Sequence, residues 1–201
     1  MSVNLHSGVA GGVPWDHTNC DGTAVCPPRC PRFVDDHGAI YHVEQYTDEH
    51  FEPLVAFYEA YPERHRSMSL PPLTRRQIES WLERLVSRGK NLLVFDGTTV
   101  VGHVAYSPRD AAESELVVFV GADYQNRGLG TELCRHAIAH AAADGQSSMR
   151  LAVATDNESA IRVYTSLGFR EVDRRAASIV MALDLDASRS DLEQAPAADP
   201  P

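Results

Sequence analysis

The stretch from Val118 to Thr131, VFVGADYQNRGLGT, constrains the fold most, because an apolar strand, a polar turn and a helix start follow one another directly. Such a turn presents unpaired backbone N–H groups at the positive end of the helix dipole. Its glycines, Gly128 and Gly130, let an anion approach the backbone because no Cβ atom stands in the way. The stretch therefore predicts a phosphate-binding turn, with a plain strand-to-helix connection as the alternative.

The length of 201 residues suits one sizeable domain with extensions, since a chain of this size buries roughly 70% of its unfolded surface. No apolar run approaches the ~20 residues that a membrane-spanning helix needs. The first residues, MSVNLHSGVAGG, lack the basic and then apolar pattern of a signal peptide. We therefore expect a cytoplasmic protein that makes no use of a membrane.

The net charge of -10 argues against nucleic acid as a partner, because phosphate-backbone binding relies on a clustered basic surface. Lys90 is the only lysine among the 18 basic residues, and the others are arginines. An acidic, lysine-poor surface stays hydrated at high salt, where surface ion pairs are screened. The composition thus indicates either a halophile or an organism with a GC-rich genome.

Residues 1–38 are rich in glycine, proline, cysteine and histidine and show no sustained helical or strand period, so we expect an N-terminal extension outside the core. Cys20, Cys26 and Cys30, together with His17, could form a tetrahedral zinc site. Their C-x5-C-x3-C spacing is not a usual ligand spacing. Reduced cysteines in a proline-stiffened arm, or an occasional disulfide, are the alternatives.

Residues 39–184 carry the periodic pattern of one α/β domain, and residues 185–201 resemble a disordered tail. We expect strands over 40–46, 91–95, 99–106, 114–120, 148–154, 169–174 and 177–183, and helices over 48–58, 75–87, 127–143 and 157–167.

Two features of the third predicted helix bear on function. Cys134 falls on its apolar stripe, so we expect a core residue rather than a reactive thiol. Glu132, His136 and His140 share another face at intervals of four. A metal site is one interpretation of this face, and the interpretation we adopt is an ordinary solvated surface, because no further element obviously supplies a ligand.

The turn QNRGLG is followed by a further strand and then by the pattern N-x-x-A-x-x-x-Y-x-x-x-G-F from Asn157 to Phe169. Together these motifs resemble the GNAT superfamily of acyl-coenzyme A dependent N-acetyltransferases, over roughly residues 40–183. The resemblance implies a mixed α/β fold, with a strongly twisted sheet of about six to seven strands flanked by about four helices. Many relatives carry proline where this chain has Ala122, which changes the stiffness of the turn more than its chemistry.

The resemblance also implies a cofactor site for acetyl-coenzyme A. Backbone groups of two strand residues would pair with pantetheine, the turn amides would hold the pyrophosphate, Arg127 and Thr131 would add a charge and a hydroxyl, and Asn157 would bond the cofactor arm. The implied residues are Phe119, Val120, Gln125, Asn126, Arg127, Gly128, Leu129, Gly130, Thr131, Asn157 and Tyr164.

Acyl transfer needs a neutral amine, a donor for the developing oxyanion and a proton for the departing thiolate. By resemblance, Tyr164 is the general acid and the Val120 N–H the oxyanion donor, although Tyr164 also has the spacing of a packing residue. Glu115 is the candidate base, with an ordinary exposed strand end as the alternative. Glu113 and His103 are weaker candidates.

Two functions from different classes remain open at the level of sequence. The first is an enzyme that moves an acetyl group from acetyl-coenzyme A to a primary amine of a protein, a peptide or a small molecule. The second is a non-catalytic acyl-coenzyme A sensor whose Cys-rich arm engages a partner. The segments that would shape the acceptor site carry no motif, and a homodimer is suggested only by family analogy.

Overall fold

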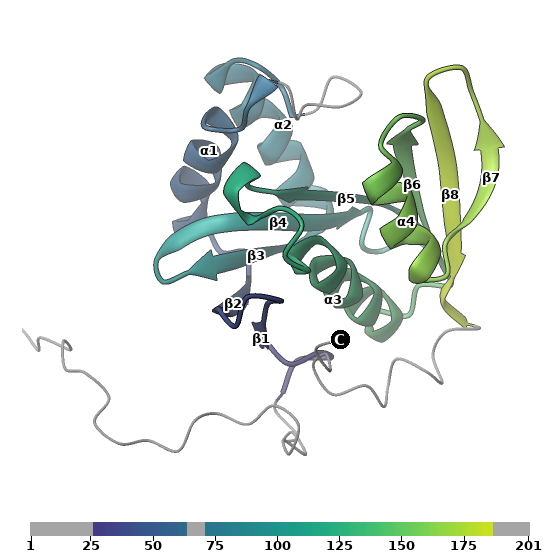
Figure 1. The fold of residues 1–201 in the computed structure, drawn as a ribbon, viewed down its shortest axis with the longest axis horizontal. Helices are drawn as coiled ribbons and strands as arrows, with labels where there is room; N and C mark the ends of the chain where they lie inside the picture. Colours follow the sequence, from purple (N-terminus) through teal and green to yellow (C-terminus); the bar gives the residue numbers. More distant parts are fainter. Residues whose placement is uncertain (1–25, 64–70, 187–201) are drawn as a thin grey trace, which may run out of the picture.

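The computed structural model describes residues 26–63 and 71–186, which build one eight-stranded mixed sheet in the order β1-β2-β3-β4-β5-β6-β8-β7 (Figure 1). Neighbouring strands are antiparallel except for β5 and β6, which are parallel. The strands are β1 (Arg32–Val34), β2 (Ile40–Gln45), β3 (Lys90–Asp96), β4 (Thr99–Ser107), β5 (Glu113–Val120), β6 (Ser148–Ala154), β7 (Arg170–Arg174) and β8 (Ser178–Asp184).

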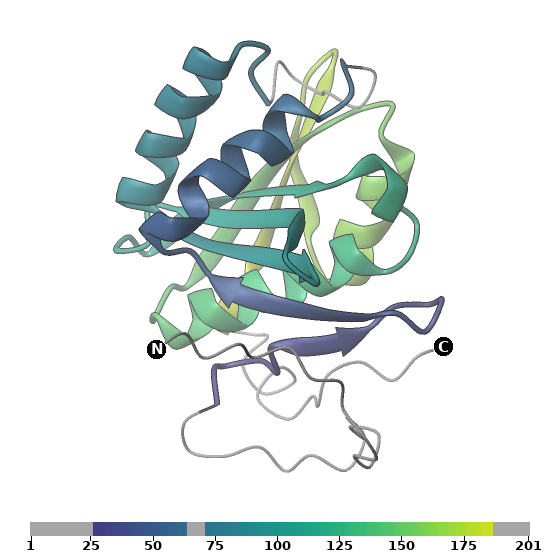
Figure 2. The same ribbon diagram turned by 90° about the vertical axis from the view of Figure 1, so that its left-hand side faces the viewer.

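Four α-helices cover the sheet, two on each face (Figures 1 and 2). Helices α1 (Phe51–Glu59) and α2 (Arg75–Arg88) enclose one apolar cluster with β3, β4 and Phe119 of β5. Helices α3 (Leu129–Ala143) and α4 (Glu158–Ser166) enclose a larger cluster on the other face. Two short 3-10 turns, η2 (Asp48–His50) and η4 (Ala122–Tyr124), precede α1 and α3.

The predicted mixed α/β class is confirmed, and the sheet has one strand more than the expected six to seven. The additional strand, β1, lies within residues 1–38, which were expected to stay outside the core. It contains three residues, too few to show a period, yet Phe33 is 3% exposed and stacks on Tyr41 of β2. The core therefore begins several residues before position 39.

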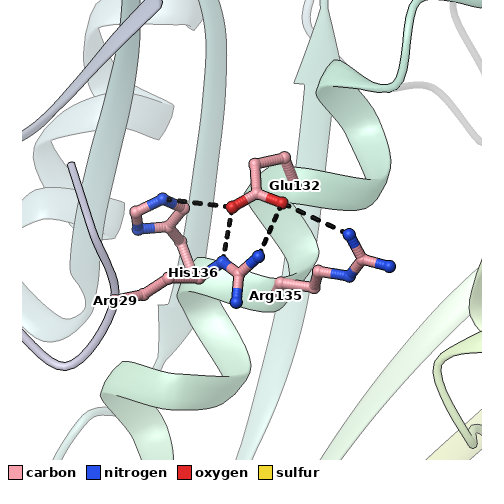
Figure 3. A network of polar contacts seen from close by, with 4 residues as sticks. All are labelled: Arg29, Glu132, Arg135 and His136. Carbon is pink, nitrogen blue, oxygen red and sulfur yellow. Dashed lines mark hydrogen bonds and ion pairs between the residues drawn. The ribbon is translucent and has the colours of Figure 1, made fainter. Parts of the chain in front are cut away.

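The flank of α3 that carries Glu132, His136 and His140 is buried, so the prediction of a solvated face is wrong. Arg29, from the segment before β1, lies across this flank and donates from Nε and Nη2 to the two carboxylate oxygens of Glu132 (Figure 3). His136 Nε2 lies 3.6 Å from Oε1 of the same Glu132 carboxylate. The N-terminal segment therefore covers a face that the helix alone would expose to water.

The predicted zinc site falls partly outside the described residues, because His17 and Cys20 precede position 26, and most of the expected tail follows position 186. Within residues 26–63 and 71–186, no three His, Cys, Asp or Glu side chains gather closely enough to hold a metal ion. In the same residues, no helix combines the length and apolarity that crossing a bilayer requires.

Candidate functional site

Strands β5 and β6 begin as neighbours and then separate. Their parallel pairing covers only Glu113 to Glu115 against Ser148 to Arg150. Beyond that point a cavity of about 810 Å³ opens between β5, the turn after it, the first turn of α3, the end of β6 and α4. The splayed strands expected from the resemblance are therefore present, and they leave the edge of β5 without a sheet partner along the cavity.

The hydrogen-bond phase of β5 decides which backbone groups face this cavity. The Gly121 N–H donates to the carbonyl of Val101, the residue that faces it on β4, at 2.8 Å. The next facing pair along the strands is Val120 and Gly102. That pair is therefore a non-hydrogen-bonded one, and the N–H and C=O of Val120 point away from β4. Because the register with β4 is regular, Val118 has the same orientation.

Phe119 has the opposite orientation. Its backbone pairs with His103 of β4, and its side chain packs against Tyr58 and Tyr61 on the α1 side of the sheet. Val118, which the sequence analysis did not single out, lines the cavity in its place. Counting back two residues from Val120 along the strand would have found it.

The turn after β5 has the geometry of an anion site. Asn126 and Gly128 adopt left-handed conformations, with φ of 57° and 84°. The Gln125 side chain donates to the Val120 carbonyl at 3.1 Å, which fastens the turn to the strand. Among the described residues, the N–H groups of residues 126–131 have no hydrogen-bond partner. They lie at the N-terminus of α3, where an anion is favoured.

Gly130 tests whether this turn has room for a ligand. A Cβ added at Gly130 would have only the Val120 Cγ2 within 4 Å, at 3.7 Å. The protein's own packing therefore does not require glycine there, and the absent side chain leaves space at the cavity wall. Thr131 lines the same wall, whereas Leu129 is buried in the core and offers only its amide.

The Arg127 side chain does not line the cavity. Its Nε and Nη2 atoms both lie 2.7 Å from Oδ2 of Asp35, and its guanidinium lies over the rings of Tyr41 and Tyr124. The positive charge that was expected at the cofactor is thus paired with a carboxylate from the β1–β2 connection.

Helix α4 contributes two predicted residues to the opposite wall. Asn157 caps the helix by accepting from the Ala160 N–H at 3.1 Å, which leaves its side-chain amide free to donate toward the cavity. Tyr164 is 9% exposed, and its hydroxyl has no hydrogen-bond partner among the described residues. Burial, reinforced by nearby Cys134 and Tyr61, raises its pKa well above the usual value, so the hydroxyl stays protonated.

Cys134 is fully buried at the inner end of the cavity, as predicted for a core residue. Burial raises the pKa of its thiol to about 12, so it is not a thiolate at neutral pH.

The candidate bases occupy different environments. Glu115 is exposed at the last residue pair before β5 and β6 separate, and it is not part of the cavity wall. His103 is fully buried between the Tyr58 hydroxyl and the Asn91 side chain, and burial lowers its pKa to about 3. Glu113 is exposed and lies 3.3 Å from Arg150. Of these groups, only the two glutamates are open to solvent.

A second cavity, of about 560 Å³, lies between α1, the β3–β4 turn and the segment after β5. Tyr61 lines both cavities. Its ring therefore stands between the cleft that Tyr164 lines and a hollow on the α1 side of the sheet.

Comparison with known proteins gives a consistent result. Residues 44–169 match the acetyltransferase (GNAT) family model. A mycothiol acetyltransferase of Catenulispora acidiphila is 34% identical over 121 residues, which is 58% of this chain and 37% of the relative. A [ribosomal protein bS18]-alanine N-acetyltransferase of Escherichia coli K12 is 31% identical over 120 residues, which is 52% of this chain and 81% of the relative. The chain thus spans little more than a third of the first relative.

Solved structures show the same fold. The GNAT domain of S. lividans PAT superposes with a TM-score of 0.68 at 21% identity, covering 76% of this chain and 95% of that domain. The yncA protein of Salmonella typhimurium, solved with its cofactor acetyl-CoA, gives a TM-score of 0.60 at 19% identity, covering 79% and 99%.

Proposed function

Since this chain belongs to the GNAT acetyltransferase family, we propose that its cleft binds acetyl-coenzyme A and that the protein transfers the acetyl group directly to a primary amine. One observation carries the proposal. A single cavity is lined by Val118 and Val120, by Tyr164 with its protonated hydroxyl, and by four turn residues whose amides are unpaired among the described residues: Asn126, Gly128, Gly130 and Thr131.

The residues present suit each part of the proposed cofactor. The amides of residues 126–131 would hold the pyrophosphate, with the Gly130 position leaving room for it. The backbone of Val118 and Val120 would pair with the pantetheine arm as an added strand does, and Asn157 would donate to the same arm. When bound, acetyl-coenzyme A would supply an activated thioester.

The chain's own groups would then serve the transfer. The N–H of Val120 would donate to the oxygen that becomes negative, and Tyr164 would give its proton to the departing sulfur and regain one from water. Glu115, where β5 and β6 separate, would take the proton of the incoming amine through water. Tyr61 borders both cavities, so we place the entry of the acceptor on its side of the cleft.

For the acceptor, we propose only that it carries a primary amine. The two relatives are named for unlike acceptors, a ribosomal protein and mycothiol. A cytoplasmic location and a homodimer, the latter by family analogy, are parts of the same proposal.

The proposal is tested by thermal unfolding with acetyl-coenzyme A, followed by thiol release across a panel of amines and amine-bearing peptides. We expect the wild-type protein to be stabilised by the cofactor and to release coenzyme A only when a suitable amine is present. Tyr164→Phe should retain the stabilisation and lose the release. Stabilisation without any amine-dependent release, and with no difference in Tyr164→Phe, would instead identify an acyl-coenzyme A sensor.

A further inference from the structure

Asp35 is held in a polar site within the connection between β1 and β2. Its Oδ1 accepts from the backbone N–H groups of His37 and Ala39 at 2.9 and 2.8 Å, and its Oδ2 accepts from the Tyr41 hydroxyl at 3.1 Å. Burial opposes its ionisation, but the amides of Ala39 and His37, the Tyr41 hydroxyl and the Arg127 charge together outweigh that and keep the pKa of Asp35 below its usual value. Its side chain has no exposed surface, so this carboxylate is fixed in position before any ligand binds.

The Asp35 carboxylate forms an ion pair with Arg127 of the proposed anion-binding turn. Both the Nε and Nη2 atoms of Arg127 lie 2.7 Å from Oδ2 of Asp35. The guanidinium carbon lies 5.8 Å from the centre of the Tyr41 ring and 5.5 Å from that of Tyr124. The Arg127 guanidinium is therefore held by an ion pair with Asp35 and by cation–π contacts with two tyrosine rings, and all three partners lie outside the QNRGLG turn.

Arg127 stands between the two left-handed residues of the turn, Asn126 and Gly128. The left-handed conformation is uncommon for residues other than glycine, and although asparagine adopts it more readily than most, contacts from outside the turn add to its stability. The contacts that hold this turn from outside include Gln125 on the Val120 carbonyl and Arg127 on Asp35. Releasing Arg127 would therefore free the centre of the turn.

We propose that Asp35 is a positioning residue for acyl-coenzyme A binding. Through Arg127 it holds residues 126–128 in the conformation that aligns the amides of residues 126–131, so the ligand meets a site that is already ordered. This inference rests on the proposed function. It also assigns Arg127 a role different from a direct contact with the pyrophosphate.

The experiment measures the Kd of coenzyme A by calorimetry, and kcat and KM for acetyl-coenzyme A, in wild type, Asp35→Asn, Arg127→Ala and the double variant. We expect each single variant to raise Kd and KM about tenfold and to leave kcat within about twofold. The double variant should be no weaker than the worse single variant, because both changes break the same contact. Arg127→Lys, which keeps the charge, should recover part of the loss.

A direct contact between Arg127 and the pyrophosphate would produce the opposite pattern and overturn the inference. Asp35→Asn would then leave Kd unchanged or lower it, because the guanidinium would be released toward the phosphates. Arg127→Ala would also reduce the dependence of Kd on salt, whereas the positioning role leaves that dependence as in wild type. Because the salt measurement needs only Arg127→Ala, it decides between the roles even if Asp35→Asn does not fold.

Tyr41→Phe is the matched control, because it removes one hydrogen bond to Asp35 and keeps both the ion pair and the ring. Its Kd should stay within about twofold of wild type. Circular dichroism and thermal unfolding of each variant report whether the fold is retained. A wild-type protein that does not bind coenzyme A refutes the proposed function, whereas wild-type binding with an unaffected Asp35→Asn variant refutes the positioning role alone.

Discussion

The N-terminal amides of α3 and the buried flank of the same helix differ in how their polar groups are paired. At the start of α3, the amides of residues 129–131 have no hydrogen-bond partners among the described residues, and Gly130 and Thr131 line the cavity. On the flank, the Glu132 carboxylate is buried against Arg29, with Arg135 and His136 close by (Figure 3). The paired charges hold the N-terminal segment on the helix and so contribute to stability, whereas the unpaired amides are the groups that we propose bind a ligand.

The largest effect is expected on the flank. Glu132→Ala would leave the Arg29 guanidinium buried without its carboxylate, so the free energy of unfolding should fall by about 3–5 kcal/mol. Urea unfolding measures this. KM for acetyl-coenzyme A should change little in the folded variant, because Glu132 does not line the cavity.

Glu158→Ala is the matched control, because that carboxylate forms an exposed pair with Arg162 on α4 and should cost no more than about 1 kcal/mol. Equal losses in the two variants would mean that the Arg29 contact does not fasten the N-terminal segment.

The same flank should make stability depend on pH. Burial lowers the pKa of His136 to about 4 in the folded protein, against about 6.5 when unfolded. Between these values the unfolded chain binds more protons, so stability falls as the pH drops from about 6.5 toward 4, by about 3 kcal/mol for this residue.

His140, with a pKa also lowered to about 4 by burial, adds to the same trend. Urea unfolding measured across this pH range should therefore show that the free energy of unfolding depends less steeply on pH in His136→Gln than in wild type. The same dependence of the free energy of unfolding on pH in the two proteins would show that His136 is not buried in its neutral form.

On the open side, the Tyr164 hydroxyl is expected to matter for chemistry and not for binding. Tyr164→Phe keeps the ring that packs on Phe169, so kcat should fall about 100-fold while KM for acetyl-coenzyme A stays near wild type. Steady-state thiol release measures both constants. Tyr46→Phe, just after the last residue of β2, is the control for losing a tyrosine hydroxyl, and a similar fall in kcat there would remove the assignment of Tyr164.

The smallest expected effect is a change in coenzyme A affinity when the turn after β5 is altered. Gly130→Ala places a methyl group at the open cavity wall, so coenzyme A should bind about tenfold more weakly. Thermal stability should be unchanged or slightly higher, because alanine favours a helix over glycine by about 0.5–1 kcal/mol. Gly128→Ala should instead lose about 1 kcal/mol of stability, because φ at Gly128 is left-handed. Unchanged affinity in Gly130→Ala would place the anion elsewhere.

Local patterns allowed most of the regular elements to be predicted. Thr74 caps α2 through its side chain, Gly89 follows the last residue of that helix, and the apolar stripe of α3 faces the sheet. Asn157 likewise caps α4 as its motif suggested. These features depend on neighbours within a few residues, so the sequence contains the whole interaction.

The rest depends on contacts between distant residues, which no local period reveals. Glu132 is buried because Arg29, which lies 103 positions earlier, covers it. Arg127 turns toward Asp35 instead of the cleft for a similar reason. Val118 lines the cavity and Phe119 does not, because the hydrogen-bonding pattern between β4 and β5 sets which residues of β5 point away from β4. That pattern belongs to the paired strands and cannot be read from β5 alone.

Amide chemical shifts of the 15N-labelled protein during titration with coenzyme A would show whether the unpaired amides of the turn and of β5 form the coenzyme A site. We expect the largest shifts at residues 126–131, Val118 and Val120, and little change at Glu132 and His136 on the flank. Saturable binding that leaves the shifts of those turn and strand amides unchanged would mean that coenzyme A binds elsewhere.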